Sequence, residues 1–502
     1  MPSNLPQLLA SNRRGALADI ARCPHMAVAL VWLLISMLVF STDAQRANGF
    51  GVPLRTSVDT TPASGSYEQL VLSHIRASGA QLIKLDVNWN EIAPPGRPAG
   101  FDPTNPDSPG YRWRDLDKET SDALARGLTP FFELYGAPRW GQTPVGSGDE
   151  HPDPAQLAQF AQAVATRFDG SHHGLPWVRY YEVWNEPNVS FFLQPQIEGG
   201  NIVSVDNYRT LIDDVAASVH GVRSDNLVIA GALFPNGLRR GNVIGIGALE
   251  FTRRLLCMSP GAHPRRVCNT TVNADIWSVH PYTTGGPSTL PANPENVWID
   301  NLGSLTSLVR EAQSAGTLVS SQPVQTWVSE FSWDSNPPDP LGVPVRLQQR
   351  WVAEALYRAW QSGISVFSWY ALRDEPLSAS SEQAGLYFYC PQGIGCDTPK
   401  PMLRSFRFPF IAYKSGRRRA LLWGRVPFGV PGTVRIQWRQ GSRWRPLTTL
   451  RTDSDGIFVA RRALPSKLNA NSGVLRAVTA SEASPSFSLH HPRDIIVTPI
   501  GS

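Results

Sequence analysis

The sequence predicts a (β/α)8 TIM barrel, an α/β fold, followed by a small C-terminal all-β sandwich domain. Two observations predict the barrel: strand-like and helix-like segments alternate, and there are eight strands, the number that closes such a barrel. A third is that two of these strands end on a glutamate, at the end of a barrel strand where chemistry is placed. With 502 residues the chain is long enough for a large core and more than one domain.

The predicted strands are rich in aromatic and β-branched residues and are bounded by turn-forming residues. They span residues 50–58, 82–88, 130–135, 178–184, 227–233, 276–280, 325–330 and 366–370. An open, doubly wound sheet is the alternative for such an alternating pattern. No glycine-rich phosphate loop follows the first strand, which favours the barrel.

Apolar residues at helical spacing predict helices between the strands. Asp153 and Pro154 form an N-cap and a first helical position ahead of one such face. A second face ends at Gly221, and a third precedes Gly363. The three faces comprise Leu157, Phe160, Val164 and Phe168; Tyr208, Leu211, Ile212, Val215 and Val219; and Trp351, Val352, Ala355, Leu356 and Ala359.

The pattern changes after about Ser415. Residues 434–439 alternate apolar and polar side chains, as a half-buried strand does, and turn sequences follow at 440–442 and 455–456. Short strands separated by turns predict a small antiparallel sandwich. We therefore assign residues 45–414 to the barrel, 415–490 to the sandwich and 491–502 to a tail.

The N-terminal segment resembles a secretory signal. Arg13, Arg14 and Arg22 precede an apolar run over residues 26–40, and Ala44 ends a plausible cleavage site. The run is shorter than the roughly 20 residues that span a bilayer, which favours a cleaved signal. An uncleaved anchor is the alternative, because the segment before the apolar run is unusually long. We expect residues 1–44 to be a signal peptide and the protein to be secreted, with no membrane contact after cleavage.

Cysteine usage agrees with export. Cys257 with Cys268, and Cys390 with Cys396, form two close pairs in loop-like sequence, which we expect to be disulfides near the barrel mouth.

The formal net charge of +5 is mild for this length. The run Arg417–Arg419 suits a solvated linker better than a phosphate-binding stripe, and no nucleic-acid motif is present, so we expect no nucleic-acid partner.

Two glutamates form the candidate catalytic pair. The stretch Tyr180–Asn188 begins as a strand and ends in Asn-Glu-Pro-Asn, where proline cannot continue a sheet ladder. Glu186 therefore stands at the tip of the fourth strand, and Glu330 closes the seventh. Across a barrel mouth the two can face each other. Glu91 and Glu375 also follow strands but lack the Asn-Glu-Pro context, so we treat them as rim residues or ion-pair partners.

Paired carboxyl groups suit the hydrolysis of an acetal, where one protonates the leaving oxygen and the other acts on the opposite face of the sugar. At a separation of about 5–5.5 Å the second carboxylate attacks directly and the anomeric configuration is retained. Crowding the two keeps one protonated near neutral pH. We expect the carboxyl groups of Glu186 and Glu330 to lie within about 6 Å of each other.

With these residues in place, the chain resembles glycoside hydrolase clan A over roughly residues 50–412. It is similar to families 5 and 39 and to the related bacterial cellulase-family glycosylhydrolases. The Trp-Asn-Glu-Pro-Asn motif implies a retaining O-glycosyl hydrolase with Glu186 as acid/base, Glu330 as nucleophile and Asn185 as partner of the sugar 2-hydroxyl. His280-Pro281-Tyr282 matches the family's His-x-Tyr, which implies that Tyr282 bonds the nucleophile and His280 lines the subsite.

Tryptophans complete the candidate substrate site. Trp369 matches the aromatic platform of the family at the end of strand eight, and Trp89 follows strand two. Aromatic rings can cover the apolar faces of sugars, but strand-end tryptophans, including Trp140 and Trp333, can equally be packing residues. His280, too, can be a packed core histidine. The basic and polar residues that separate cellulases, mannanases, xylosidases and uronidases find no match, so family and substrate stay open.

We therefore expect a secreted, monomeric retaining glycosidase acting on a polysaccharide, oligosaccharide or glycoside, without cofactor or metal. The alternatives are a carbohydrate-binding protein on a decayed barrel and a structural cell-surface protein. One further expectation concerns the barrel interior. Glu182 shares a strand face with Glu186, and Lys84 lies among apolar residues of strand two, so we expect a buried Lys84–Glu182 ion pair.

Overall fold

The predicted barrel is confirmed by a computed structural model of the chain, which describes residues 52–59, 67–377, 382–492 and 494–497. Eight parallel strands close on themselves in the order β1, β2, β3, β4, β7, β11, β13, β16 and back to β1. Each overlaps one of the eight predicted strands. They are β1 (Arg55–Asp59), β2 (Leu82–Asn88), β3 (Thr129–Tyr135), β4 (Tyr180–Val183), β7 (Leu227–Leu233), β11 (Ile276–Val279), β13 (Gln325–Val328) and β16 (Ile364–Trp369).

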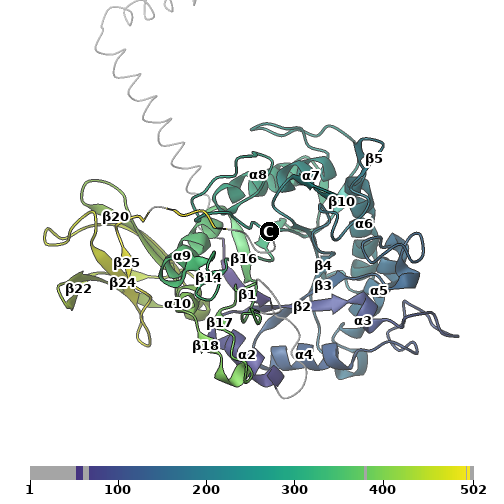
Figure 1. The fold of residues 1–502 in the computed structure, drawn as a ribbon, viewed down its shortest axis with the longest axis horizontal. Coiled ribbons are helices and arrows are strands. Elements are labelled where there is room, and N and C mark those ends of the chain that lie inside the picture. Colours follow the sequence, from purple (N-terminus) through teal and green to yellow (C-terminus); the bar gives the residue numbers. More distant parts are fainter. Residues whose placement is uncertain (1–51, 60–66, 378–381, 493, 498–502) are drawn as a thin grey trace, which may run out of the picture. The chain divides into compact units, whose positions relative to one another are not determined.

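Helices surround the ring of strands, as Figure 1 shows in a view along the barrel. They are α2 (Glu68–Ala77), α3 (Trp89–Ile92), α4 (Arg114–Ala125), α5 (Pro154–Arg167), α6 (Ser204–Val222), α7 (Ala248–Leu255), α8 (Leu302–Ser314), α9 (Val345–Gln361) and α10 (Pro401–Arg407). The loops contain short strands of two or three residues, among them β8 (Leu238–Arg240) and β9 (Val243–Gly245), which pair as a hairpin.

The helix signals act as predicted at α5 and α9, but α6 continues through Gly221 to Val222, so the predicted stop at Gly221 is wrong. The Asp153 side chain caps α5 by accepting a hydrogen bond of 3.0 Å from the Gln156 N–H, and Pro154 opens the helix. The predicted apolar faces of α5, α6 and α9 are buried. Each helix therefore packs its apolar stripe against the barrel, which is what amphipathic periodicity of this kind achieves.

Side chains inside the barrel form two layers of opposite character. A separate apolar cluster comprises Leu82, Phe131, Tyr180, Leu227, Ile229, Ile276, Trp327 and Val366. Two residues further along the strands, on the same inward face, the buried side chains are polar: Lys84, Glu133, Glu182, Ser278, Ser329 and Ser368. We call these the apolar layer and the polar layer. The polar layer lies nearer the carboxyl ends of the strands, where the candidate site is.

The C-terminal region consists of two antiparallel sheets. One contains β19 (Phe410–Lys414), β20 (Arg419–Arg425) and β23 (Ile457–Ala463); the other contains β21 (Thr433–Gln440), β22 (Arg443–Arg451), β24 (Val474–Val478) and β25 (Phe487–Ser488). Because β19 pairs with β20, the β region begins at Phe410 and not at residue 415, which corrects the predicted boundary.

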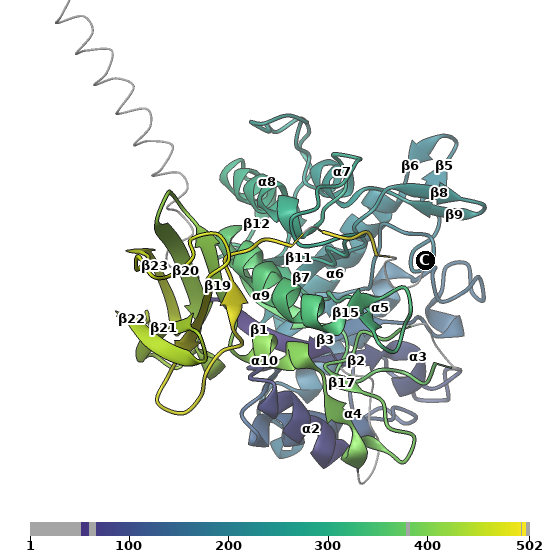
Figure 2. The ribbon, with the colours of Figure 1, turned by 60° about the vertical axis from the view of Figure 1, so that its left-hand side comes forward.

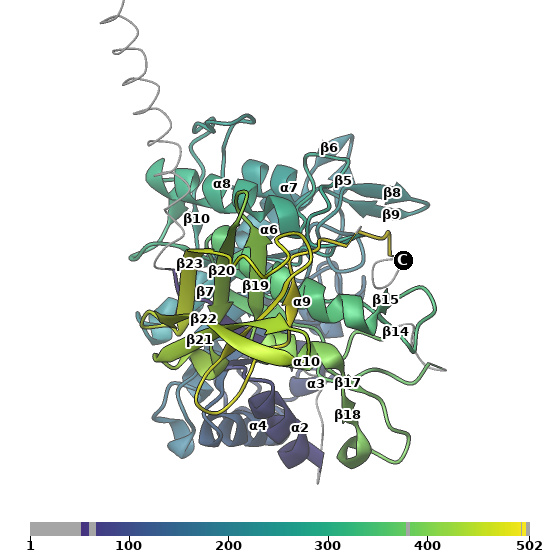
Figure 3. The ribbon, with the colours of Figure 1, turned by 90° about the vertical axis from the view of Figure 1, so that its left-hand side faces the viewer.

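The two sheets belong to the same compact unit as the barrel, residues 52–502. They lie beside α9 and α10 (Figures 2 and 3), and the ring of Trp423 packs against Tyr357 and Trp360 of α9. The tail is not free where it is described: the Val497 N–H donates to the Thr284 carbonyl at 3.0 Å, in the loop after β11.

Both predicted cysteine pairs are at disulfide distance, with Cα separations of 5.3 Å for Cys257–Cys268 and 5.7 Å for Cys390–Cys396. The second pair lies between β16 and α10, on the mouth side, as expected. The first lies between α7 and β11, and helices return the chain to the amino ends of the strands. The expectation of a mouth position was therefore wrong for Cys257–Cys268.

The predicted signal peptide, residues 1–44, lies outside the described residues. No helix within the described ranges has the length and apolar character needed to cross a membrane.

Candidate active site

Glu186 is presented by a sharply bent segment that follows β4. Trp184 and Glu186 have φ angles of 67° and 39°, in the left-handed region that side chains other than glycine rarely adopt. Two backbone hydrogen bonds hold this turn: Trp184 N–H to the Leu134 carbonyl at 2.9 Å, and Glu186 N–H to the Ala232 carbonyl at 3.0 Å. Such local strain persists where surrounding contacts impose it and is concentrated at functional sites.

Asn188, the last residue of the motif, has a structural role. Its side-chain amide donates to the carbonyls of Phe234 (2.8 Å) and Ile246 (2.7 Å) and accepts from the Phe234 N–H (2.9 Å). The residue is fully buried. It therefore ties the loop after β4 to the loop after β7 and keeps the Glu186 turn in place.

Glu330 follows β13 and is held by three groups. The Tyr282 hydroxyl donates to Oε1 at 2.6 Å, Lys84 Nζ lies 3.4 Å from Oε2, and His280 Nδ1 lies 3.8 Å from Oε2. All three act on the ionised carboxylate as donors or positive charges. The seventh strand thus ends on a carboxylate whose environment favours the charged form.

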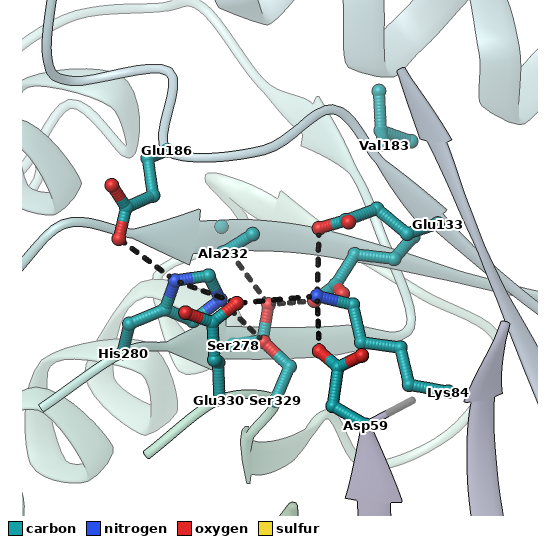
Figure 4. Close-up of polar contacts among 12 residues, drawn as sticks. Asp59, Lys84, Glu133, Val183, Glu186, Ala232, Ser278, His280, Ser329 and Glu330 are labelled. Carbon is teal, nitrogen blue, oxygen red and sulfur yellow. Dashed lines mark hydrogen bonds and ion pairs between the residues drawn. The ribbon is translucent and has the colours of Figure 1, made fainter. Parts of the chain in front are cut away.

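The two glutamates face each other, with His280 between them (Figure 4). A carboxylate oxygen of Glu186, a ring nitrogen of His280 and a carboxylate oxygen of Glu330 lie within 4.8 Å of one another. This meets the expected separation of the two carboxyl groups. His280 is fully buried and places Nδ1 3.0 Å from Glu186 Oε1 and Nε2 3.1 Å from the Ser329 hydroxyl.

The environments move the pKa values of the two glutamates in opposite directions. Burial raises the pKa of Glu186, which outweighs the opposing hydrogen bond and charge of His280. Burial acts in the same sense on Glu330, but the charges of His280 and Lys84 and the hydrogen bond from Tyr282 together lower its pKa below the ordinary value. Pairs of carboxyl groups separated in this way divide into a proton donor and an anion.

Lys84 is the centre of the polar layer. Its ammonium group is 3.1 Å from Glu133, 3.2 Å from Asp59 and 3.4 Å from Glu330, and the residue is 1% exposed (Figure 4). Burial disfavours its charge, yet the three carboxyl groups raise the pKa of Lys84 well above the usual value. With one cation for three acids, burial raises the pKa of Asp59 to about 7 and that of Glu133 well above its usual value.

The predicted Lys84–Glu182 pair is corrected by this arrangement. Glu182 is fully buried inside the barrel, as expected, but Oε1 accepts a hydrogen bond from the Ser278 hydroxyl at 2.6 Å and not from Lys84. Glu133 and Glu182 are register partners on neighbouring strands and occupy the same level. Lys84 contacts the one on β3, the strand next to its own.

Asn185 and Tyr282 lie at the catalytic pair, whereas the two tryptophans do not present a face to it. Asn185 Oδ1 is buried and has no hydrogen-bond partner among the described residues. Trp89 is fully buried, with its ring stacked on Phe160. Trp369 is fully buried and donates to the Ala384 carbonyl at 2.8 Å. The expected stacking of these rings on sugar is therefore corrected to core packing.

Sequence reasoning missed Asp59 and Glu133 as residues of the site. Both had a signal: each is an acid in or at the end of an otherwise apolar strand, as Lys84 is a base in one. Asp59 is the register partner of Lys84 on the neighbouring strand, which explains their contact.

Within the described residues, two groups of three side chains bring potential metal ligands within 4.8 Å of one another. One is Glu186, His280 and Glu330, where the Lys84 ammonium group 3.4 Å from Glu330 opposes a further cation. The other consists of Asp107, His172 and His173 near the surface, and both imidazoles lie within hydrogen-bonding distance of Asp107 Oδ1. Hydrogen bonds and ion pairs account for both groups, and the absence of a metal stays a prediction.

No family model matches the sequence, and no curated protein matches it either. Among solved structures, the fold is similar to a family 39 glycoside hydrolase from the gut symbiont Bacteroides cellulosilyticus WH2, at 16% identity and a TM-score of 0.51, covering 82% of this chain and 79% of that one. A β-glycosidase from Pyrococcus horikoshii matches at 11% identity, with a TM-score of 0.43 and coverages of 71% and 92%.

Bacteroides uniformis β-glucuronidase 2 matches at 11% identity, with a TM-score of 0.42 and 89% of this chain covered. The match spans 46% of the glucuronidase, just under half of its length. Of these three matches, the first carries the conclusion: the chain has the (β/α)8 barrel fold found in a family 39 glycoside hydrolase.

Proposed function

We propose that this protein is a retaining glycosidase that cleaves β-O-glycosidic bonds, with Glu330 as nucleophile and Glu186 as acid/base. The observation that carries the proposal is the facing pair of carboxylates, with one oxygen of each within 4.8 Å of the other and with pKa values displaced in opposite directions. A separation of this kind suits direct attack, since inverting enzymes leave room for a water between carboxyl groups about 6.5–9.5 Å apart.

The reaction proceeds in two displacements. The Glu330 carboxylate attacks the anomeric carbon while Glu186 gives its proton to the leaving oxygen, so the glycosidic bond breaks and a glycosyl ester forms. Glu186, now ionised, takes a proton from water, whose oxygen attacks the same carbon and releases Glu330. The raised pKa of Glu186 supplies the acid in the first step, and the lowered pKa of Glu330 supplies the anion.

Neighbouring residues have positioning roles in this scheme. Lys84 and Tyr282 keep Glu330 ionised and oriented through contacts of 3.4 and 2.6 Å. His280 orients Glu186 through its Nδ1 atom, and the Ser329 hydroxyl fixes the His280 ring at Nε2. Asn185, whose buried Oδ1 has no partner among the described residues, is the group we assign to the sugar 2-hydroxyl.

The protein is also proposed to be secreted and monomeric, with a carbohydrate as its partner. The signal-like N-terminus and the two cysteine pairs at disulfide distance support export to an oxidising compartment. N-terminal sequencing of protein recovered from the culture medium tests this: we expect the mature chain to begin after residue 44, and an intact Met1 in the membrane fraction would contradict it.

Hydrolysis of aryl β-glycosides by the purified protein tests the enzymatic proposal. We expect turnover of at least one member of a panel of glucoside, galactoside, mannoside and xyloside, and a loss of about 10⁴-fold or more in Glu330→Gln. Glu311→Gln, on the exposed face of α8, is the matched control and should retain full activity. Sugar binding without turnover, equal in all three proteins, would indicate a binding module instead.

A further inference from the structure

Carboxyl groups outnumber basic groups at the catalytic pair. Four of them interact electrostatically with Glu330, namely Asp59, Asp86, Glu186 and Glu382, and burial raises the pKa of each of the four. The ion pairs that Glu186 and Glu330 form with other described residues involve two basic side chains, Lys84 and His280, and no arginine. The site therefore has more acids than bases.

Neither basic group is available to a negatively charged ligand. Lys84 is 1% exposed and already contacts three carboxyl groups at 3.1–3.4 Å. His280 is fully buried, with one ring nitrogen near both glutamates and the other at the Ser329 hydroxyl. A carboxylate bound here would need a free arginine or lysine, since these are the side chains that satisfy it with charge-assisted hydrogen bonds.

The loop that follows β16 contains Arg373 and Lys400, but both are already paired, Arg373 with Asp397 at 2.7 Å and Lys400 with Asp374. Residues 60–66 and 378–381, which lie outside the described ranges and follow β1 and β16 in the chain, contain no lysine, arginine or histidine. Beyond the second of them, Glu382 accepts a hydrogen bond from the Tyr370 hydroxyl at 3.0 Å. Tyr370 directly follows β16, so this acid belongs to the same end of the barrel.

We propose that the sugar bound between Glu186 and Glu330 is uncharged, and that the site rejects uronic acids. Ionised carboxylates accept hydrogen bonds and donate none, so they suit the hydroxyl groups of a neutral sugar. A uronate in the same place would bring a second negative charge beside Glu330, and neither Lys84 nor His280 is free to pair with it. This inference rests on the proposed glycosidase function and adds the class of its glycone.

Matched pairs of aryl β-glycosides that differ only at C6 test the inference: glucoside with glucuronide, galactoside with galacturonide, and mannoside with mannuronide. In the pair whose ring stereochemistry the enzyme accepts, we expect kcat/KM for the neutral member to exceed that for the uronide by at least about a hundredfold, because juxtaposed like charges oppose binding. A uronide cleaved as fast as its neutral partner would overturn the inference.

A charge-neutralising variant tests the physical cause. Burial raises the pKa of Glu382, so the comparison is made at a pH where this carboxyl is ionised. There Glu382→Gln removes one negative charge, and the ratio of uronide to neutral kcat/KM should rise by about threefold to tenfold. Glu311→Gln, the same substitution on the exposed face of α8, should leave the ratio unchanged. Loss of stability alone would lower both rates together, so an unchanged ratio in Glu382→Gln would contradict the electrostatic explanation.

The outcomes separate this inference from the function on which it rests. Uronide hydrolysis that disappears in Glu330→Gln would leave the glycosidase assignment standing and overturn the neutral glycone. Absence of turnover on every neutral and charged pair would overturn the glycosidase function itself, and the inference with it.

Discussion

The apolar layer and the polar layer of the barrel interior are built by the same strands, two residues apart. Leu82 and Lys84 are neighbours on the inward face of β2, and Phe131 and Glu133 on that of β3. The apolar layer fills the barrel with aromatic and aliphatic side chains. The polar layer buries an ammonium group and several carboxyl groups next to the candidate nucleophile.

The two layers have different roles: the apolar layer stabilises the fold, and the polar layer controls the ionisation of Glu330. Burial of apolar side chains stabilises the fold by about 25 cal/mol for each Å² removed from water. Burial of charges costs free energy that ion pairing offsets in part, so a cluster such as that of Lys84 is weak evidence for stability. What the polar layer does supply is an electric field at Glu330. Substitutions in the two layers should therefore have separable effects.

The largest effect is expected from Lys84→Met. Removing the ammonium group leaves Asp59, Glu133 and Glu330 without their shared cation, and we expect the free energy of unfolding to fall by about 3–5 kcal/mol at pH 7. Urea denaturation measures it. Lys118→Met, the same substitution in an ion pair whose lysine side chain is 53% exposed, should change the stability little, because solvent screens the pair. Equal losses of stability in the two variants would contradict the claim that the buried ammonium group of Lys84 is needed to compensate the carboxyl groups around it.

In the apolar layer, Trp327→Leu should destabilise the fold by about 2 kcal/mol, because the smaller side chain leaves space beside Phe131 and Tyr180. The pH dependence of kcat/KM should stay that of the wild type, since Trp327 contributes no charge to Glu330. A shift of the acid side of the pH–activity profile in this variant would show that the two layers do not act separately.

A smaller loss is expected from Ser278→Ala in the polar layer. The hydroxyl donates to Glu182 at 2.6 Å and accepts from the Ala232 N–H at 2.7 Å, so its removal leaves buried groups unpaired. We expect a loss of about 1–2 kcal/mol in the free energy of unfolding. Thermal denaturation followed by circular dichroism measures it, and a variant as stable as the wild type would show that Glu182 has another partner.

The smallest effect concerns pH. Activity requires ionised Glu330 and protonated Glu186, so it should fall as pH drops through the lowered pKa of Glu330 and as pH rises through the raised pKa of Glu186. Tyr282→Phe removes a 2.6 Å hydrogen bond to the ionised Glu330, so the pKa of Glu330 should rise. The acid limb of kcat/KM should then move up by about one pH unit. A limb that moves down or stays would contradict the role of Tyr282.

The sequence predicted the fold and the facing glutamates because both rest on local patterns. Eight apolar strands mark the barrel, and Glu186 and Glu330 end two of them. The partners of Lys84 could not be predicted, since β3 and β4 each carry a buried glutamate at one level and only the register and tilt of the strands decide between them. Trp89 and Trp369 illustrate the same limit, because a strand-end ring can face the site or the surrounding helices.

The anomeric configuration of the first product tests the central claim most directly. Proton NMR during hydrolysis of an aryl β-glycoside resolves the anomers before mutarotation mixes them. With an oxygen of Glu186 and an oxygen of Glu330 within 4.8 Å of each other, two displacements at the same carbon should release the β-anomer first. Initial release of the α-anomer would mean that water attacks directly, and it would contradict Glu330 as the nucleophile.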